Sequence, residues 1–276
     1  MLARPGGFFR PAFCLYLAGL YNNAMQKPLM YLVVAVCLVI SLYMAKKRID
    51  RRTAALTANA PTEGKSRTDV VRRIKEGEAF VLKLDELGYF KYTDSQHLSA
   101  LQNYMAKNSD PATGFPGCFT DGDSTSYSVS FRCFGADNED LFEEGGFTGL
   151  LRDMQPVFDK MGVAMKVTAH REVWDDKNHW LNHSISLNGR PYTIFKNFKG
   201  YGWGEAMAKF TQIVNTELEI QGSDERLYPW RAANDGLVAL LTEQQLQYIH
   251  SKFPGKHDRP LPLREWCDLY QVTIPE

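Results

Sequence analysis

The sequence lacks most of the features that assign a function by inspection. It has no net charge, because 32 Lys and Arg residues balance 32 Asp and Glu residues. No overall electrostatic field attracts the chain to nucleic acid, and we expect no nucleic-acid partner. Repeats and low-complexity tracts are also absent. A packed globular domain is therefore the expected form of most of the chain.

Cysteine is scarce. The five cysteines lie at positions 14, 37, 118, 133 and 267, and no two of them form a Cys-x-x-Cys pair. This spacing excludes a small disulfide-rich fold. Reduced thiols in a reducing compartment are the favoured interpretation, and a single bridge between Cys118 and Cys133 is the alternative that the sequence leaves open.

Catalytic motifs are missing too. The sequence contains no Gly-x-Ser-x-Gly nucleophile motif. We assign no catalytic residue and expect no cofactor. Because active sites assemble from distant segments, this absence favours a non-enzymatic protein without excluding an enzyme.

The most distinctive segment that is present runs without charge from Pro28 to Ala45. As a helix it would extend about 27 Å, close to the thickness of a bilayer's hydrocarbon core. Tyr31 and Tyr43 lie near its two ends, where amphipathic rings suit the interface. We interpret residues 28–45 as a single transmembrane anchor in the lipid bilayer. A secretory signal peptide is the alternative, but Tyr43 and Met44 replace the small residues that a cleavage site needs.

The charges that flank this segment predict its orientation. Only Lys27 is close on the N-terminal side, whereas five basic residues follow on the other: Lys46, Lys47, Arg48, Arg51 and Arg52. Short basic loops stay in the cytoplasm, so we expect a cytoplasmic C-terminal domain. The domain would be periplasmic or extracellular if the segment acts as a signal-anchor led by Lys27.

The anchor divides the chain into four parts. Residues 1–27 form an N-terminal extension, in which Met25 is a natural start that would leave residues 1–24 untranslated. Residues 46–65 form a basic flank and a small, polar linker. Residues 66–276 are long enough for a soluble domain with its own core.

Helical periodicity recurs in the soluble part. It predicts a helix over 67–86 and a second helix capped by Asp94, and we expect the two to pack as a hairpin. Further helices are expected over 150–161, from Ala206 to Leu218, after Thr242, and around Trp266. The acidic stretch at 135–146 is interpreted as a loop.

Alternation of polar and apolar residues predicts the strands. It is clearest over Tyr127–Cys133, where Arg132 falls on the solvent face. Asn188-Gly189 predicts a two-residue hairpin turn that pairs Leu187 with Arg190, Ile185 with Tyr192, and His183 with Ile194. We count about six strands and predict an α+β fold: one mainly antiparallel sheet with flanking helices.

Two histidines have the spacing of metal ligands. On a helix, His179 and His183 would lie on one face, but this segment has strand character, which separates them by about 13 Å. We therefore assign no metal site, with His179 and His183 as the only candidates. His183 is expected to be half-buried in the sheet and His179 to lie at the surface.

The stretch KGYGWGE is the most site-like loop, and Tyr201, Gly202, Trp203 and Gly204 are its candidate binding residues. It lacks the glycine spacing and the Lys-Ser/Thr pair of phosphate-binding loops. We expect Trp203 to be an exposed anchor for a protein partner. In the alternative, Trp203 plugs the core.

Two functions are consistent with these patterns. The first is a single-pass tethered module that binds an unknown protein partner, as an immunity-type protein or an accessory subunit of an envelope complex does. The second is a membrane-tethered hydrolase with a site assembled at the sheet edge from some of His170, Glu172, Asp175 and His183.

Overall fold

The computed structural model describes residues 67–118 and 129–274, which form one compact unit from Arg67 onward. The expected anchor at 28–45 and the linker at 46–65 lie outside the described residues. Among the helices that are described, none combines the length and the apolar character that crossing a bilayer requires.

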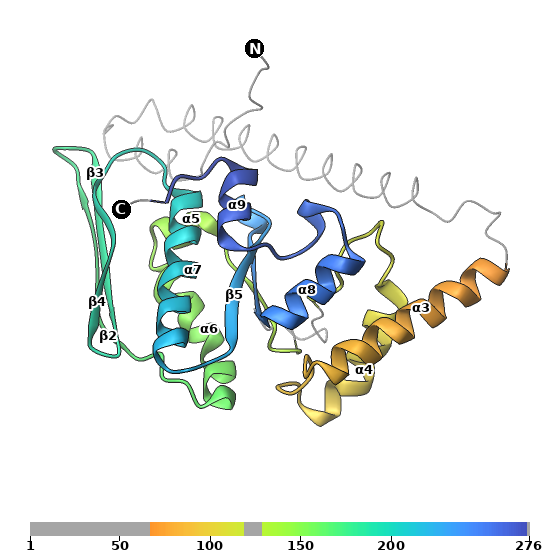
Figure 1. Cartoon of the computed structure of the whole chain (residues 1–276). Coiled ribbons are helices and arrows are strands. Elements are labelled where there is room, and N and C mark those ends of the chain that lie inside the picture. Colours follow the sequence, from red (N-terminus) through yellow and green to blue (C-terminus); the bar gives the residue numbers. More distant parts are fainter. Residues whose placement is uncertain (1–66, 119–128, 275–276) are drawn as a thin grey trace, which may run out of the picture. The chain divides into compact units, whose positions relative to one another are not determined.

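The described residues contain seven α-helices and six strands (Figure 1). The helices are α3 (Arg67–Glu86), α4 (Ser95–Asn108), α5 (Asn138–Phe142), α6 (Gly146–Met161), α7 (Trp203–Ile220), α8 (Glu243–Lys252) and α9 (Leu263–Tyr270). The strands are β1 (Cys133–Gly135), β2 (Val167–Asp175), β3 (Trp180–Leu187), β4 (Arg190–Phe198), β5 (Glu225–Trp230) and β6 (Leu237–Thr242). Short 3-10 turns span Ala233–Asp235 and Lys256–Asp258.

The strands form two antiparallel sheets of three within the described part of the chain. The order of the first, which we call the inner sheet, is β1-β6-β5. The order of the second, the outer sheet, is β2-β3-β4. The α+β class and the antiparallel pairing are as the sequence predicts, but the single six-stranded sheet is wrong, because helices separate the two groups of strands.

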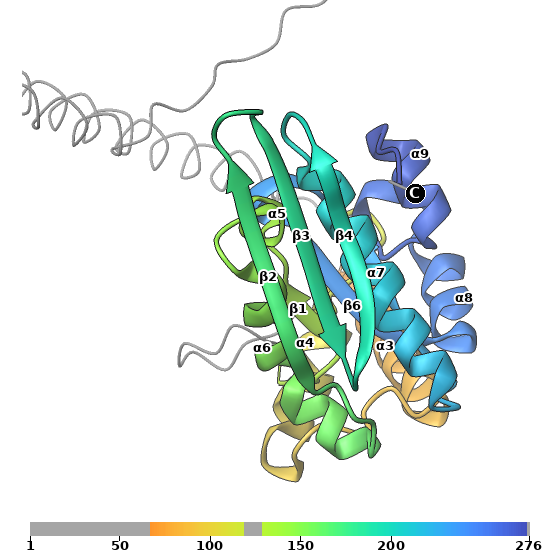
Figure 2. The ribbon, with the colours of Figure 1, turned by 90° about the vertical axis from the view of Figure 1, so that its left-hand side faces the viewer.

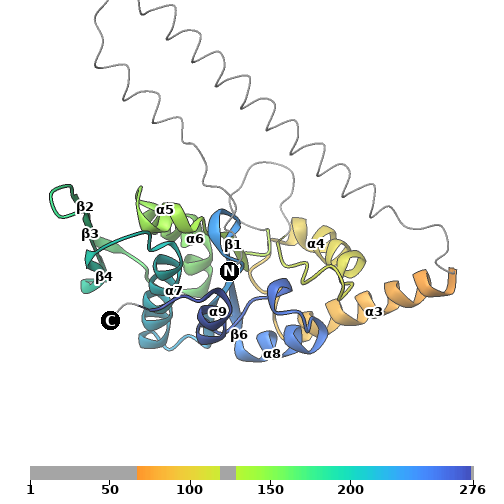
Figure 3. The same cartoon turned by 90° about the horizontal axis from the view of Figure 1, so that it is seen from above.

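The elements are stacked in layers (Figures 1 and 3). Helices α5, α6 and α7 lie between the outer and inner sheets, and α3, α4 and α8 lie on the other side of the inner sheet. Along β6, Val238 and Leu240 belong to the core cluster around α6 and α7, whereas Ala239 and Leu241 belong to the cluster around α3, α4 and α8. The inner sheet is thus buried on both faces, which explains the uninterrupted apolar run of β6.

The outer sheet is covered on one face only. Residues of β3 alternate between buried and partly exposed, and Figure 2 shows the uncovered face in front with the helices behind it. Leu181, Ile185 and Leu187 point into the core beneath. This is the pattern of an antiparallel sheet with one solvated face.

The hairpin between β3 and β4 turns where the sequence predicts. Asn188 and Gly189 both have positive φ, 53° and 82°, as this turn type requires. Leu187 pairs with Arg190 and Ile185 with Tyr192 as expected, but His183 pairs with Phe195 instead of Ile194. A register shift between His183 and Ser184 leaves Ile194 of β4 as the extra residue, and it allows both Ile194 and Phe195 to be buried.

Buried polar contacts fix this hairpin to α7. The carboxylate of Glu217, which is fully buried, accepts hydrogen bonds from Arg190 Nε at 2.8 Å and Tyr192 OH at 2.5 Å. Asn188 Nδ2 donates to the same carboxylate at 2.8 Å. The orientation of the outer sheet against the helices is therefore set by charge as well as by packing.

The expected helical hairpin is confirmed. Helix α3 has the predicted bounds, α4 follows Asp94, and the two helices pack together. Leu84 on α3 and Leu101 and Met105 on α4 are fully buried in one cluster. The capping box of Thr242 and Gln245 at the start of α8 is also present.

The predicted strand over Tyr127–Cys133 is wrong. Regular pairing begins only at Cys133, Phe131 has a φ of 54°, and Tyr127 lies outside the described residues. Arg132, expected on the solvent face, is completely buried. The acidic stretch interpreted as a loop contains α5, whose first amides are capped by the Asp137 side chain.

The expectation of reduced thiols is also wrong for one pair. Cys118 and Cys133 form a disulfide, with their Cα atoms 5.5 Å apart. The bridge joins the segment that follows α4 to the start of β1. Cys267, in α9, is the free cysteine among the described residues, and it is buried.

Candidate functional site

Three metal-ligating side chains meet on the outer sheet. His170 and Glu172 are two residues apart on β2 and share a face, and His183 on β3 is directly opposite Glu172. Nε2 of His170 lies 2.9 Å from Nε2 of His183. Oε2 of Glu172 lies 3.8 Å from Nε2 of His183 and 4.0 Å from Nε2 of His170. We call these three residues the His–Glu–His cluster.

The cluster has one buried side and one accessible side. The His183 side chain is fully buried, with its ring edge-to-face against Phe147 at a centroid distance of 5.2 Å. The side chains of His170 and Glu172 keep exposures of 21% and 19%. A small ligand that reaches the cluster can therefore do so from the side of β2, the edge strand.

The loop before α6 holds the carboxylate in place. Oε1 of Glu172 accepts a hydrogen bond from the backbone amide of Glu144 at 2.8 Å, and Oε2 accepts one from Gly145 at 3.2 Å. The amide groups at a helix start favour negative charge. Glu172 is thus fixed with Oε2 directed toward the two imidazoles.

His183 is held in its neutral form. Burial, followed by the neighbouring His170, lowers the pKa of His183 to about 4, although the backbone of Phe142 acts in the opposite direction. Its Nδ1 atom is buried and makes no hydrogen bond of good geometry within the described residues. A neutral imidazole has a lone pair available for a proton or a metal ion.

The structure assigns a different partner to His183 than the spacing in sequence suggests. His179 is exposed in the turn between β2 and β3, with a φ of 54°, and does not join His183. Of the four residues of the hydrolase hypothesis, Asp175 is the one that stays apart, because its carboxylate accepts hydrogen bonds from Asn178 in that turn. A turn at 176–179 connects β2 to β3 and sets the register that places Glu172 opposite His183. The register of this hairpin was the signal that sequence reasoning missed.

The glycine loop before α7 is partly packed. Tyr201 is 84% exposed, whereas Trp203 is partly buried against the core, and its Nε1 is buried without a hydrogen-bond partner among the described residues. A Cβ atom on Gly202 would lie 2.7 Å from the Phe198 ring, and one on Gly204 would collide with Val272. Close packing therefore accounts for these two glycines, and the expectation of a fully exposed Trp203 is wrong.

Large aromatic residues lie at one end of the outer sheet. Trp174 is near the end of β2 and is 42% exposed, Trp180 begins β3, and Tyr201 and Trp203 follow β4. These strand ends lie together at the top of Figure 2. Lys199 lies over the Trp180 ring at 5.6 Å. We call these four aromatic residues the aromatic end, which holds three of the chain's five tryptophans.

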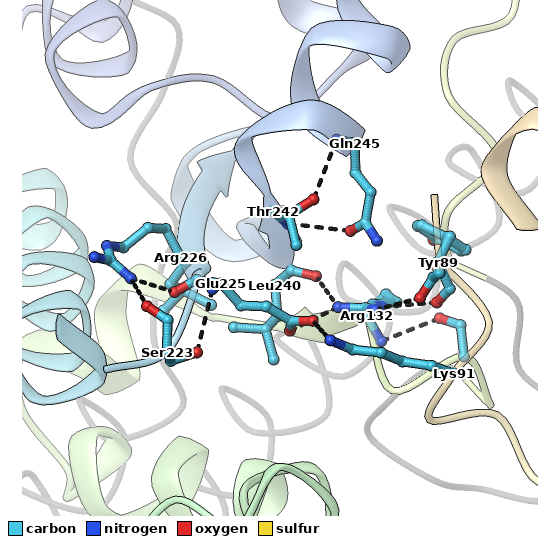
Figure 4. Close-up of polar contacts among 12 residues, drawn as sticks. Tyr89, Lys91, Arg132, Ser223, Glu225, Arg226, Leu240, Thr242 and Gln245 are labelled. Carbon is cyan, nitrogen blue, oxygen red and sulfur yellow. Dashed lines mark hydrogen bonds and ion pairs between the residues drawn. The ribbon is translucent and has the colours of Figure 1, made fainter. Parts of the chain in front are cut away.

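A second polar cluster lies inside the molecule (Figure 4). Arg132 Nη1 lies 2.7 Å from Glu225 Oε2, and both side chains are fully buried. The guanidinium also donates to the carbonyls of Gly88, Tyr89 and Leu240. Lys91 Nζ lies 2.7 Å from the other carboxylate oxygen. This cluster ties the turn after α3 to the inner sheet.

The Arg132–Glu225 cluster is structural. Its charges are paired, and the guanidinium lies over the Tyr92 ring at 4.6 Å, which leaves no side open to a ligand. A surface pocket of about 510 Å³ adjoins it, lined in part by Gly88, Lys91 and Glu243. The ammonium group of Lys91 is already engaged by Glu225, and we assign no function to this pocket.

No protein-family model, curated protein or solved structure matches the chain. The functional assignment therefore depends on the geometry above.

Proposed function

We propose that the protein is a single-pass membrane-tethered domain that binds a protein partner through its aromatic end. The observation that carries this proposal is the concentration of Trp174, Trp180, Tyr201 and Trp203 at the same end of the outer sheet, with Tyr201 84% exposed. Tryptophan and tyrosine dominate the energy of protein interfaces because they bury a large area with little loss of side-chain entropy. An immunity-type protein or an accessory subunit of an envelope complex would act in this way.

Site-specific photocrosslinking tests this function. A photoreactive phenylalanine analogue at Tyr201 in the full chain should give one crosslinked band of defined mass. The matched control is the same analogue at Ile220, which is 54% exposed at the other end of α7. The band should be lost when Trp174→Ala is added. Equal bands from positions 201 and 220, or none from 201, would refute the aromatic end as the binding surface.

The tether is proposed from the uncharged segment at residues 28–45. The full chain should stay with the membrane fraction during carbonate extraction. Deletion of residues 28–45 should release it. Release of the full chain from the membrane by carbonate would refute the anchor at residues 28–45.

We propose that the domain lies in an oxidising compartment. Disulfides such as that between Cys118 and Cys133 persist outside the cytoplasm, whereas the basic flank at 46–52 predicts the cytoplasmic side. We give more weight to the disulfide, because Lys27 also allows the reverse orientation.

Thiol trapping separates the two orientations. Cells are quenched in acid, and the denatured chain is alkylated with a polyethylene-glycol maleimide before and after reduction. Two additional cysteines should react only after reduction, and the Cys118→Ala, Cys133→Ala double variant should show no such change. Full reactivity without reduction would return the domain to the cytoplasm.

A membrane-tethered hydrolase is the second candidate function. The observation that favours it is the meeting of His170, Glu172 and His183, three of the four residues named for that hypothesis. A neutral imidazole beside a carboxylate is a suitable general base. The two functions are separable, because His170→Gln should leave the Tyr201 crosslink intact.

A further inference from the structure

We propose that the His–Glu–His cluster binds a divalent transition metal ion, with zinc as the best fit, through Nε2 of His170, Nε2 of His183 and Oε2 of Glu172. This site is independent of the anchor and of the aromatic end. It is the group of three or more potential ligands that the described residues bring together.

The ligand set suits zinc. Two imidazoles and one carboxylate form a recurrent three-residue set for zinc, and the fourth position is then taken by water or substrate. Imidazole nitrogen also favours transition metals over calcium and magnesium, which prefer oxygen. The accessible side of His170 and Glu172 provides room for the fourth ligand.

The distances suit a single ion. Zinc bonds to nitrogen and oxygen of about 2.0–2.2 Å place the ligand atoms of a tetrahedral site roughly 3.3 Å apart. The three separations in the cluster are 2.9, 3.8 and 4.0 Å, on both sides of that value. Side-chain rotations that move each ligand atom by less than about 1 Å therefore bring all three into the coordination sphere.

The surroundings of the ligands are already in place. Two backbone amides fix the carboxylate of Glu172, and Phe147 packs against the ring of His183. Both strands belong to the same hairpin, which limits backbone movement. Hydrogen bonds and packing contacts of this kind orient metal ligands before the ion arrives.

A simple hydrogen bond between the two histidines explains less of the geometry. It accounts for the 2.9 Å distance between the Nε2 atoms. It gives no role to the carboxylate oxygen that the amides of Glu144 and Gly145 direct at the same point, because 3.8 Å and 4.0 Å are too far for a hydrogen bond to either ring. A metal ion between the three atoms uses all of them.

Zinc titration of the full chain tests the site. The chain is purified in detergent and treated with EDTA, and zinc chloride binding is followed by competition with a chromophoric chelator. One zinc ion per chain should bind, and cobalt should give the visible absorption of a tetrahedral site. His170→Gln and Glu172→Gln should each weaken the zinc affinity about 100-fold or more. Losing a residue that only orients a metal ligand already weakens metal affinity 10–100-fold.

His179→Asn is the matched control. His179 is the exposed histidine four residues before His183, and asparagine tolerates its positive φ. Its affinity for zinc should equal that of the unmodified chain. The zinc affinity of His183→Gln is interpreted together with its thermal melt, because the His183 ring is part of the core and the variant can lose stability. His170→Gln and Glu172→Gln change partly exposed side chains, so they test the site without this complication. No zinc binding, an unchanged affinity in His170→Gln, or a loss in His179→Asn would overturn the proposal.

Discussion

The Arg132–Glu225 cluster of the inner sheet and the His–Glu–His cluster of the outer sheet bury their polar groups in opposite ways. In the inner sheet, Arg132 and Glu225 have no exposure, and the guanidinium donates hydrogen bonds to a carboxylate and three carbonyls. In the outer sheet, His170 and Glu172 keep access to solvent, and His183 retains a buried Nδ1 without a good hydrogen bond in the described part of the chain. The charges of the first cluster are paired with one another, and the second cluster retains capacity to bind.

The difference follows from how each sheet is covered. Helices pack on both faces of the inner sheet, so water cannot solvate a charge there and the protein must pair it. The outer sheet is covered on one face and has a free edge at β2. Polar residues near that edge can stay partly unpaired at lower cost, because solvent is close.

Removing Arg132 should have the largest effect on stability. Arg132→Met leaves the buried Glu225 carboxylate with Lys91 as its remaining partner, and we expect a loss of roughly 3–5 kcal/mol. The control is Arg171→Met, at an exposed position of β2, which should change stability by less than about 0.5 kcal/mol. Urea unfolding followed by tryptophan fluorescence measures both. Equal losses in the two variants would erase the contrast between the sheets.

Acid should act mainly on the outer sheet. The pKa of His183 is about 4 in the folded chain, below the value of about 6.5 expected for an unfolded histidine, so the unfolded state binds more protons between these pH values. The stabilisation is complete above pH 6.5 and should fall by roughly 3 kcal/mol as the pH drops through 4.

His183→Gln provides the check on this pH dependence. The variant should flatten the curve of unfolding free energy against pH, with a remainder from His250, whose pKa burial also lowers. An unchanged slope in His183→Gln would show that His183 is not held neutral.

The disulfide between Cys118 and Cys133 should stabilise the fold about as much as the neutral His183 does. Cys118 and Cys133 are 15 residues apart, and a loop of this length predicts a loss of roughly 3 kcal/mol when both are replaced by alanine. Thermal or urea unfolding with and without reductant measures this loss. Reductant should destabilise the unmodified chain and leave the double variant unaffected. A chain indifferent to reductant would contradict the bridge.

The aromatic end should give the smallest effects and the sharpest contrast within one loop. Trp203→Ala removes a half-buried indole, and we expect a loss of about 2 kcal/mol, between an exposed anchor and a core plug. Tyr201→Ala should stay within about 0.5 kcal/mol because its side chain is 84% exposed. Trp203→Ala should also weaken the partner crosslink from the analogue at position 201. A loss above about 3 kcal/mol for Trp203→Ala would place its indole fully in the core.

Local signals in the sequence determined much of the secondary structure. The bounds of α3, the capping box of α8 and the hairpin at Asn188-Gly189 follow from residues close together in the chain. The strand predicted over Tyr127–Cys133 failed because Arg132, polar by type, finds its partners at Glu225 and in the turn after α3. Alternation of polar and apolar residues indicates which side chains share a face of a strand. It cannot show that a charged side chain is buried when its partner is distant in the sequence.

The candidate site likewise depends partly on local sequence and partly on tertiary packing. Sequence alone supplied the residues of the hydrolase hypothesis. It offered His179 and His183 as metal candidates from their spacing, and it assigned no metal site because a strand separates them by about 13 Å. Only the folded hairpin places His183 against His170 and Glu172 and leaves Asp175 and His179 in the turn. The tertiary structure also divides the six described strands between two sheets, because α5, α6 and α7 pack between them. Periodicity is set by neighbours in sequence, whereas the partners of a buried charge, a thiol or an imidazole are set by which distant segments pack together.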